Sequence, residues 1–268
     1  MSSLERRIAA AIRFDDGAAY ERMMGTWSQL AGEVFVSWLA PAPRQRWIDV
    51  CCGNGAFTQI IADHCEPAEV LGVDLSADQV RFARSRPAAQ LAAFGKGDAM
   101  ALPFPDARFD AAVMALAIYF APDPERAVSE MVRVVRPGGS VSTYTWDMPG
   151  GGSPTALLRA EMEALGVAPL NPPSNAASQA DALRMLWTQA GLEQIRSREI
   201  VVTREFGSFE DFWTTTTRGP NVGPAITAAT RDQQDRLKSR LRSRLSITAD
   251  GCVVCTARAN AITGHKPG

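Results

Sequence analysis

The chain has 268 residues, of which 46% are hydrophobic and 21% are charged. This balance is typical of a globular protein with a sizeable core, and it excludes a disordered chain, a collagen and a coiled coil. The 28 Lys and Arg residues stand against 29 Asp and Glu, so the basic excess of most nucleic-acid-binding proteins is absent. The longest uncharged apolar run, residues 111–122, is shorter than the roughly 20 residues that cross a membrane. We therefore expect neither a nucleic-acid partner nor an integral membrane segment.

The N-terminal segment and the cysteine content predict the compartment. Only a few apolar residues separate Arg7 from Arg13, which is too few for the core of a signal peptide. Five cysteines do not make a disulfide framework in a chain of this length. We expect a soluble protein of a reducing compartment, the cytoplasm.

The predicted elements begin with a helix over residues 28–39, where apolar residues recur at a spacing of three and four. Alternating strands and helices follow. Strands are predicted at 47–50, 70–75, 91–94, 109–118 and 140–146, and the helices between them at 58–65, from Ser76 and from Asp123 to the Pro137-Gly-Gly139 segment. This alternation predicts an α/β protein with a doubly wound, Rossmann-like sheet that is mostly parallel.

The last 120 or so residues have a different character. Helices are predicted at 155–165, 180–190, 208–217 and 231–245, and strands at 192–206 and 252–259. Two strands this close in sequence favour antiparallel pairing, so we expect an antiparallel edge strand. The interpretation is a single domain, with N-terminal cap helices in residues 1–43, an α/β core in 44–146, and helical cap insertions and edge strands in 147–268.

Glycine and carboxylate residues follow the predicted strands at the edge where open α/β sheets bind ligands. Gly53 and Gly55 come after the first strand, where they allow the backbone to approach a ligand. Asp74 ends the second strand about 20 residues further on, a position suited to ribose hydroxyls. Asp98 ends the third strand, and the apolar end of the fourth forms a wall. The pattern predicts a nucleoside cofactor.

One alternative is a nicotinamide-dependent oxidoreductase. Dinucleotide sites use the pattern G-x-G-x-x-G, and Thr58 stands here in place of the third glycine. The missing glycine counts against this alternative without excluding it.

Four segments together resemble the class I S-adenosylmethionine-dependent methyltransferases, and within them the small-molecule group that includes the ubiquinone and menaquinone biosynthesis enzymes. The segments are WIDVCCGNGAFT, VLGVDLS, GDAMALPFPDARFDAAV and APDPERAVSEMVRVVRPGG, and they extend over about residues 47–146 in the family's order and spacing. The upstream segment YERMMGTWS, from Tyr20, is similar to the cap helix of that group. The resemblance implies S-adenosyl-L-methionine as cofactor and a small-molecule methyl acceptor.

The resemblance also implies roles for individual residues around the cofactor. Its methionine end is expected near the acid Asp49, the turn glycines Gly53 and Gly55, the carbonyl region of Ala115 and Leu116, and the cap residue Tyr20. Its nucleoside end is expected at Asp74 for the ribose, Leu75 beside the adenine, Asp98 for the adenine amino group and Ala99, whose amide faces the ring.

Two departures from the family pattern affect the site. Cys51 stands where the family has its first glycine, so a positive φ there would strain the turn. Tyr119 and Phe120 replace a pair that is often histidine in relatives, which removes a possible base. The same fold therefore leaves a second alternative open, a protein that binds the cofactor without turnover.

Methyl transfer from a sulfonium mainly requires proximity and alignment, and a base is needed only where the acceptor must lose a proton. The two histidines, His64 at a helix end and His265 in the C-terminal tail, are not expected to be catalytic. Tyr119 is the candidate catalytic side chain. We expect Tyr119, Trp146 and Trp213 to line the acceptor pocket, and a partly apolar or aromatic acceptor to fit it.

Two further motifs have structural interpretations. Cys252 and Cys255 form a C-x-x-C within a predicted strand and lack a second ligand pair, so we expect side-chain packing and no metal site. The basic segment 231–245 is expected to be a solvated helix docked on the protein. A regulatory module that binds nucleic acid or lipid through this helix remains an alternative, and it would depend on Arg242 and Arg244.

Overall fold

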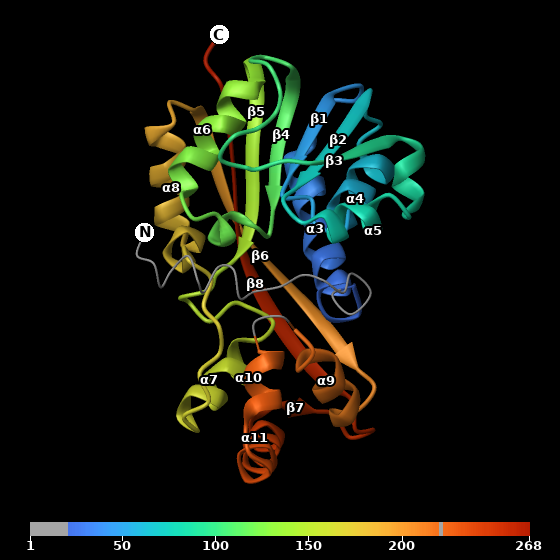
Figure 1. Cartoon of the computed structure of the whole chain (residues 1–268), viewed down its shortest axis with the longest axis vertical. Helices are drawn as coiled ribbons and strands as arrows, with labels where there is room; N and C mark the ends of the chain where they lie inside the picture. Colours follow the sequence, from blue (N-terminus) through green and yellow to red (C-terminus); the bar gives the residue numbers. More distant parts are fainter. Residues whose placement is uncertain (1–20, 220–221) are drawn as a thin grey trace.

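The computed structural model describes residues 21–219 and 222–268, which form one large mixed sheet flanked by helices (Figure 1). The strand order is β3-β2-β1-β4-β5-β8-β6, and the short β7 pairs with β8. The strands are β1 (Arg46–Val50), β2 (Glu69–Asp74), β3 (Ala92–Lys96), β4 (Phe109–Ala115), β5 (Val135–Trp146), β6 (Glu193–Phe206), β7 (Ser246–Ile247) and β8 (Val253–His265). The first five pair in parallel, as the alternation of elements predicts.

The helices fall into two groups in space. Those on the sheet are α3 (Thr26–Leu39), α4 (Ala56–His64), α5 (Ala77–Ala83), α6 (Pro124–Val134) and α8 (Ala180–Gln189). Those of a separate helical lobe are α7 (Ala156–Ala164), α9 (Phe209–Thr216), α10 (Gly223–Ala228) and α11 (Arg231–Arg244). The short turns η1 (Glu21–Gly25), η2 (Pro87–Gln90), η3 (Ile118–Phe120) and η4 (Asn175–Ser178) complete the described chain.

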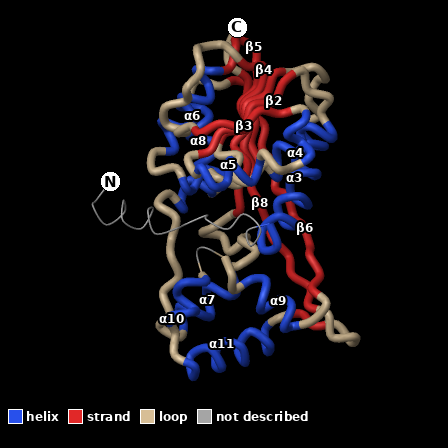
Figure 2. Tube along the Cα trace, turned by 45° about the vertical axis from the view of Figure 1, so that its right-hand side comes forward, coloured by secondary structure: helices blue, strands red, loops and turns tan. Residues whose placement is uncertain are grey.

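Both faces of the sheet are covered, so the sheet is doubly wound (Figure 2). Successive strand residues point to opposite faces, and neighbours in β1 accordingly enter different apolar clusters. Trp47 joins the cluster that includes Phe35 of α3 and Phe57 of α4, whereas Ile48 joins the one that includes Met131 of α6 and Trp187 of α8. The near-continuous apolar sequence of these strands follows from burial on both faces.

Antiparallel pairing occurs on the β6 side of the sheet. Strand β8 runs antiparallel to both β5 and β6, and β6 is the outermost strand. Trp146, the last residue of β5, pairs with Ala259, while β8 continues alongside β6 as far as the Phe206–Val253 pair. The two strands thus extend about 20 Å past the end of β5. They carry the helical lobe, which lies beyond the carboxyl ends of the parallel strands (Figures 1 and 2).

The structure corrects several predicted details. Helix α6 ends at Val134, and the Pro137-Gly-Gly139 segment lies inside β5, which begins at Val135. Residue His265 ends β8 and pairs with Ser140, so it is part of the sheet. The sequence pattern missed α10 and β7 because both are short.

Two other points bear on the expected properties. Cys252 precedes β8 and Cys255 lies within it, and both are free thiols. Among the described helices, none combines the length and the apolar character needed to cross a membrane.

Candidate functional site

The carboxyl group of Asp49 lies inside the protein near the end of β1. The side chain is fully buried, and Thr58 Oγ1 of α4 donates a 2.6 Å hydrogen bond to Asp49 Oδ2. The other oxygen, Oδ1, is buried and has no hydrogen-bond partner within residues 21–219 and 222–268. A buried acceptor without a partner is costly, so this oxygen is suited to a donor that a ligand brings.

Electrostatics make the same position unusual. Burial raises the pKa of Asp49 to about 7, against the hydrogen bond from Thr58, and the nearby charge of Asp74 adds to the rise. A cationic ligand group near Oδ1 would favour the ionised carboxylate. Ordinary core positions rarely hold such a carboxyl group, which marks this one as a functional candidate.

The turn after β1 uses the left-handed region of φ at three alternate residues. Cys51 has φ 57°, Gly53 has φ 53° and Gly55 has φ 79°. At Gly55 a Cβ would also lie 3.0 Å from the Cβ of Ala83, so glycine is required there for space as well. At Gly53 no atom lies within 4 Å of an ideal Cβ, which leaves that side of the turn open to a ligand. Cys51, which replaces the first glycine of the family pattern, therefore has a positive φ. The turn keeps the expected register, and Cys51 is a strained residue within it.

Asp74, the last residue of β2, ties this turn to the next strand. The amide of Gly53 donates to Asp74 Oδ2 at 2.9 Å, and the amide of Ser76 donates to Oδ1 at 2.8 Å. Burial raises the pKa of Asp74, and these two backbone hydrogen bonds partly offset the rise. Each oxygen retains acceptor capacity for a further donor, as a pair of ribose hydroxyls would require.

Leu75 and Asp98 lie at the neighbouring strand ends. Leu75 is 64% exposed although it is a large apolar side chain, and such exposure is what a flat ring of a ligand would cover. The amide of Gly97 donates to the carbonyl of Asp74 at 3.0 Å, which brings the end of β3 beside that of β2. Asp98 Oδ1 accepts the amide of Met100 at 2.9 Å, and Ala99 is buried.

The end of β4 contains a second strained residue. Leu116 has φ 54°, and its amide donates to the carbonyl of Tyr144 at 2.8 Å. Strands β1 and β4 are neighbours, with Asp49 paired to Val113, so the strained residues Cys51 and Leu116 follow adjacent strands. Backbone strain of this kind costs roughly 1–3 kcal/mol per residue and clusters at functional sites. Ala115, half-buried, precedes Leu116 at this edge.

The expected acceptor residues share one apolar cluster. Tyr119 in η3 and Trp146 at the end of β5 are buried members of it, and Trp213 of α9 packs against it from the helical lobe. The Trp146 ring meets Trp27 edge-on at 6.4 Å, and the Trp213 ring stacks on Phe209 at 6.5 Å. Tyr20, the remaining predicted residue, lies outside the described residues.

A polar network beside the glycine turn was missed by the sequence analysis. Asn54, nearly buried between the two glycines, donates through Nδ2 to Glu21 Oε2 at 2.7 Å. Arg86 donates through Nε to the carbonyl of Asn54 at 2.6 Å and forms an ion pair with Glu21. The three residues are distant in sequence, so no local pattern could reveal them. Thr58 was likewise missed as the partner of Asp49, although its place early in the helix after the turn was visible.

The site therefore combines a strained, open turn with carboxylates at three successive strand ends. Asp49 is suited to a cationic group, Asp74 to a diol, and Leu75 with Asp98 to a flat ring that bears an amino group. This is the recognition chemistry of a nucleoside cofactor that carries an ammonium group.

Comparison with known proteins gives the family of this region. Residues 48–143 match the family described as "Methyltransferase domain". Malonyl-[acyl-carrier protein] O-methyltransferase of Methylococcus capsulatus is 37% identical over 139 residues, which are 52% of this chain and 49% of that protein. The chloroplastic 2-phytyl-1,4-beta-naphthoquinone methyltransferase of Arabidopsis thaliana is 32% identical over 123 residues, 43% of this chain and 46% of that protein. The chain thus spans about half the length of these curated relatives.

A solved structure extends the likeness of fold beyond the matched region. Phosphoethanolamine N-methyltransferase 2 of Haemonchus contortus, in complex with S-adenosyl-L-methionine, covers 93% of this chain and 56% of its own, at 20% identity and a TM-score of 0.59. These matches give no support to the oxidoreductase alternative. Over residues 48–143 the chain therefore matches the methyltransferase domain family, in agreement with the resemblance of its sequence motifs to class I S-adenosylmethionine-dependent methyltransferases.

Proposed function

We propose that this protein transfers the methyl group of S-adenosyl-L-methionine to a small, partly apolar or aromatic metabolite. The observation that carries the proposal is the buried, unpaired Oδ1 of Asp49 beside an open glycine turn. A ligand that donates a hydrogen bond to this oxygen would give the buried carboxylate its missing partner. The ammonium group of the cofactor's methionine end is such a ligand group.

The remaining residues fit the other parts of the cofactor. Gly53 leaves room for the cofactor beside the turn, Gly55 allows the turn its positive φ, and Ala115 and Leu116 offer main-chain groups from the adjacent strand end. Asp74 would accept the ribose hydroxyls. Leu75 would cover the adenine, whose amino group Asp98 would accept while Ala99 presents its amide to the ring.

When bound, the cofactor supplies a methyl group on a positively charged sulfur, which is a good leaving group. The work of the protein is then to hold the acceptor in line and to exclude water. Tyr119 is buried near the β4 end, where its hydroxyl can orient an acceptor or take part in a proton transfer. An acceptor that loses no proton on methylation needs no base.

The apolar surroundings support a partly apolar acceptor. The cluster that contains Tyr119 and Trp146 continues into the helical lobe up to Trp213, so an acceptor between them would meet mainly aromatic and aliphatic groups. The relatives whose names mention a naphthoquinone and an acyl carrier agree with such a substrate class. We also propose the cytoplasm as the compartment, since all five cysteines are free.

The first experiment is a calorimetric titration with S-adenosylmethionine, S-adenosylhomocysteine and NADH. We expect the first two to bind and NADH to be silent, after which radiolabelled methyl transfer is followed over a panel of quinols, phenols and fatty acids. Binding of NADH alone would replace the proposal with the oxidoreductase. Cofactor binding without transfer to any acceptor would favour the protein without turnover.

The role of Asp74 is tested in the same titration. We expect Asp74→Asn to weaken S-adenosylmethionine binding by about 1–3 kcal/mol, because an amide cannot accept both from the two backbone amides and from the ribose. Asp63→Asn, on the exposed side of α4, is the matched control and should bind as the unmodified protein does. Equal affinities of a folded Asp74→Asn protein and the control would place the ribose elsewhere.

A further inference from the structure

The segment between β3 and β4 carries Asp98 and Ala99 but is not a strand of the sheet. Within it the amide of Ala101 donates to the carbonyl of Asp98 at 3.0 Å, and the amide of Phe104 donates to that of Leu102 at 2.8 Å. Local turns of this kind do not fix a segment relative to the sheet. Its start is tied to β2 by the hydrogen bond from Gly97 to Asp74, and Ala99 and Leu102 pack in the apolar cluster that includes Val73. The polar groups of residues 100–104 are held by another element.

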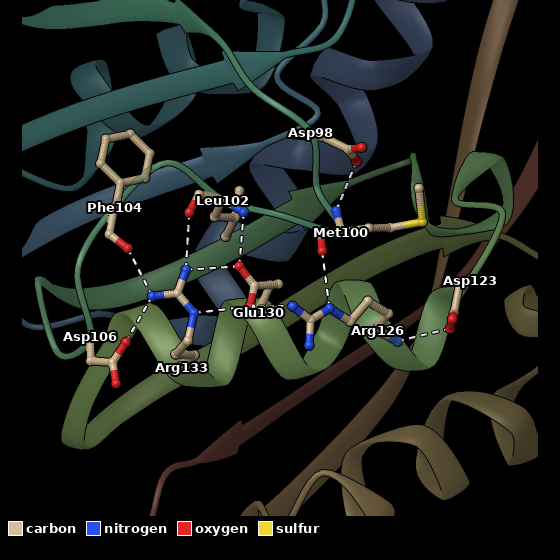
Figure 3. A network of polar contacts seen from close by, with 9 residues as sticks. All are labelled: Asp98, Met100, Leu102, Phe104, Asp106, Asp123, Arg126, Glu130 and Arg133. Atoms are coloured by element: carbon tan, nitrogen blue, oxygen red, sulfur yellow. Dashed lines mark hydrogen bonds and ion pairs between the residues drawn. The ribbon is translucent and has the colours of Figure 1, made fainter.

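Helix α6 supplies these contacts through one face (Figure 3). Arg126, Glu130 and Arg133 are spaced four and three residues apart, so their side chains lie along one side of the helix. Arg126 Nε donates to the carbonyl of Met100 at 3.0 Å. Arg133 donates to the carbonyls of Leu102 at 3.0 Å and of Phe104 at 2.8 Å.

Glu130 completes the set by binding the backbone amide of Leu102. Its Oε2 accepts the amide of Leu102 at 2.8 Å, while Arg133 Nη2 donates to the same oxygen at 2.7 Å. Leu102 is thus held at both its amide and its carbonyl. The carbonyls of Met100, Leu102 and Phe104 thus all accept hydrogen bonds from side chains of α6.

The two arginines of this set face two carboxylates, Glu130 and Asp106. Glu130 is buried, and hydrogen bonds from Arg133 lower its pKa, so it stays ionised. Arg133 also pairs with Asp106 at 2.8 Å, and Arg126 lies 3.3 Å from Glu130. A buried carboxylate held by two guanidinium groups and an amide is well ordered, since any displacement would leave a buried charge without a partner.

The set connects directly to Asp98. Met100 donates its amide to Asp98 Oδ1, and the carbonyl of the same residue accepts from Arg126 (Figure 3). Arg126 is itself anchored, because its amide donates to Asp123 Oδ1 at 2.9 Å at the start of α6. A single residue therefore separates the carboxylate of Asp98 from the helix.

We propose that Arg126, Glu130 and Arg133 are positioning residues that set the selectivity of the site for an amino-bearing purine, by holding Asp98 where the amino group lies. The proposal rests on the function proposed above. The three side chains touch no ligand themselves. They act through the backbone of residues 100–104, so their loss lowers the discrimination between purines as well as the stability of the fold.

The test compares two ligands that differ at the purine. S-adenosylhomocysteine has an amino group that Asp98 can accept, and S-inosylhomocysteine has a carbonyl oxygen in its place. We expect Glu130→Gln to weaken S-adenosylhomocysteine binding about tenfold and S-inosylhomocysteine binding less than about twofold, because only the first ligand uses the position of Asp98. The Arg126 side chain is 56% exposed, so Arg126→Ala should fold. We expect it to lower the ratio of the affinities for S-adenosylhomocysteine and S-inosylhomocysteine about threefold.

Glu69→Gln is the matched control. It breaks a pair in which Arg108 Nη2 lies 2.6 Å from both carboxylate oxygens, at the amino end of β2 and so at the opposite edge of the sheet. It should lower the melting temperature and leave the ligand preference unchanged. Equal weakening of both ligands in the folded α6 variants, or an unchanged preference, would make the set merely structural and overturn the proposal.

The unmodified protein separates the two levels of the argument. If it binds S-adenosylhomocysteine without preference over S-inosylhomocysteine, the positioning proposal falls and the proposed function stands. If it binds neither ligand, the proposed function fails and the positioning proposal falls with it.

Discussion

The carboxyl group of Asp49 destabilises the folded protein that contains it. Its pKa lies at about 7 in the folded state, above the ordinary value of 3.8 for an exposed aspartate. Between these values the unfolded chain gives up its proton while the folded protein keeps it. The free energy of unfolding therefore falls as the pH rises from about 4 to about 7, and the full penalty remains above that range.

Replacing this group should separate stability from binding. We expect Asp49→Asn to raise the free energy of unfolding at pH 8 by roughly 2–4 kcal/mol, and to leave it nearly unchanged at pH 4. Thr58 can still donate to the amide oxygen of the variant. Thermal unfolding at the two pH values gives the stability, and titration at pH 8 should show that S-adenosylmethionine no longer binds tightly. A variant with the pH dependence of the unmodified protein would mean that Asp49 is ionised throughout.

Cys51 stores strain in the turn that Asp49 precedes. A left-handed conformation costs a residue with a Cβ about 1–2 kcal/mol, whereas glycine adopts it freely but loses more chain entropy on folding. A β-branched residue at the same φ is worse. The cysteine is thus tolerated at this position, but the conformation of the turn does not depend on its side chain.

This strain predicts an order of stabilities. The free energy of unfolding of Cys51→Gly should lie within about 1 kcal/mol of that of the unmodified protein, whereas that of Cys51→Val should be lower by about 2 kcal/mol or more. Cys65, buried at the end of α4 with φ −111°, is the control, because there Cys65→Gly should be the more damaging change. Denaturant unfolding of Cys51→Gly, Cys51→Val, Cys65→Gly and Cys65→Val measures the order. The same order at both positions would show that φ at Cys51 carries no penalty.

Helix α11 is basic, yet its cations have partners inside the helical lobe. Arg240 and Arg244 form ion pairs with Glu161 of α7, which is 1% exposed. Burial alone would raise the pKa of Glu161, but the hydrogen bonds from the two arginines outweigh it and the pKa is lowered. Arg242 pairs with Glu210 of α9 and lies over the Phe209 ring. These contacts account for the basic pattern through packing of the lobe, and binding of lipid or nucleic acid stays an untested alternative.

The expected consequence is a loss of stability when the arginines are removed. Arg240→Ala combined with Arg244→Ala should cost roughly 2–4 kcal/mol, because it leaves Glu161 buried without a partner. Adding Glu161→Leu should restore most of this loss. Arg236→Ala removes an exposed pair with Asp232 and should cost less than about 1 kcal/mol. Chemical unfolding checks the series, and equal effects of the double variant and Arg236→Ala would contradict it.

On the scale of the whole molecule, the site lies where two parts of the chain face each other. The α/β part contributes the carboxyl ends of β1 to β5, and the helical lobe stands beyond them on the extended β6 and β8 (Figure 1). The turn η1 connects the two parts. Glu21 reaches the glycine turn, and Arg204 of β6 donates to the carbonyl of Met23 at 3.0 Å. An acceptor held between the parts would thus be shielded from water by the lobe.

Local sequence signals predicted most of the elements that carry the candidate site. The elements from β1 to α6 were predicted within a few residues, because strands buried on both faces and capped helices have strong local patterns. Ser76, for example, accepts the amide of Gln79 as the N-cap of α5. The positions of Asp49, Gly53, Asp74 and Asp98 at strand ends followed from the parallel topology alone.

Contacts between distant residues could not be predicted in this way. The sequence by itself determined the α/β class, the order of the strand-end residues and the glycine turn, because these depend on patterns within a few residues. Only the tertiary structure decided that Asp49 keeps an unpaired oxygen, that Glu21 and Arg86 meet at Asn54, and that α6 holds the segment after Asp98. Burial and pairing are properties of neighbours in space, and here those neighbours come from elements far apart in the chain.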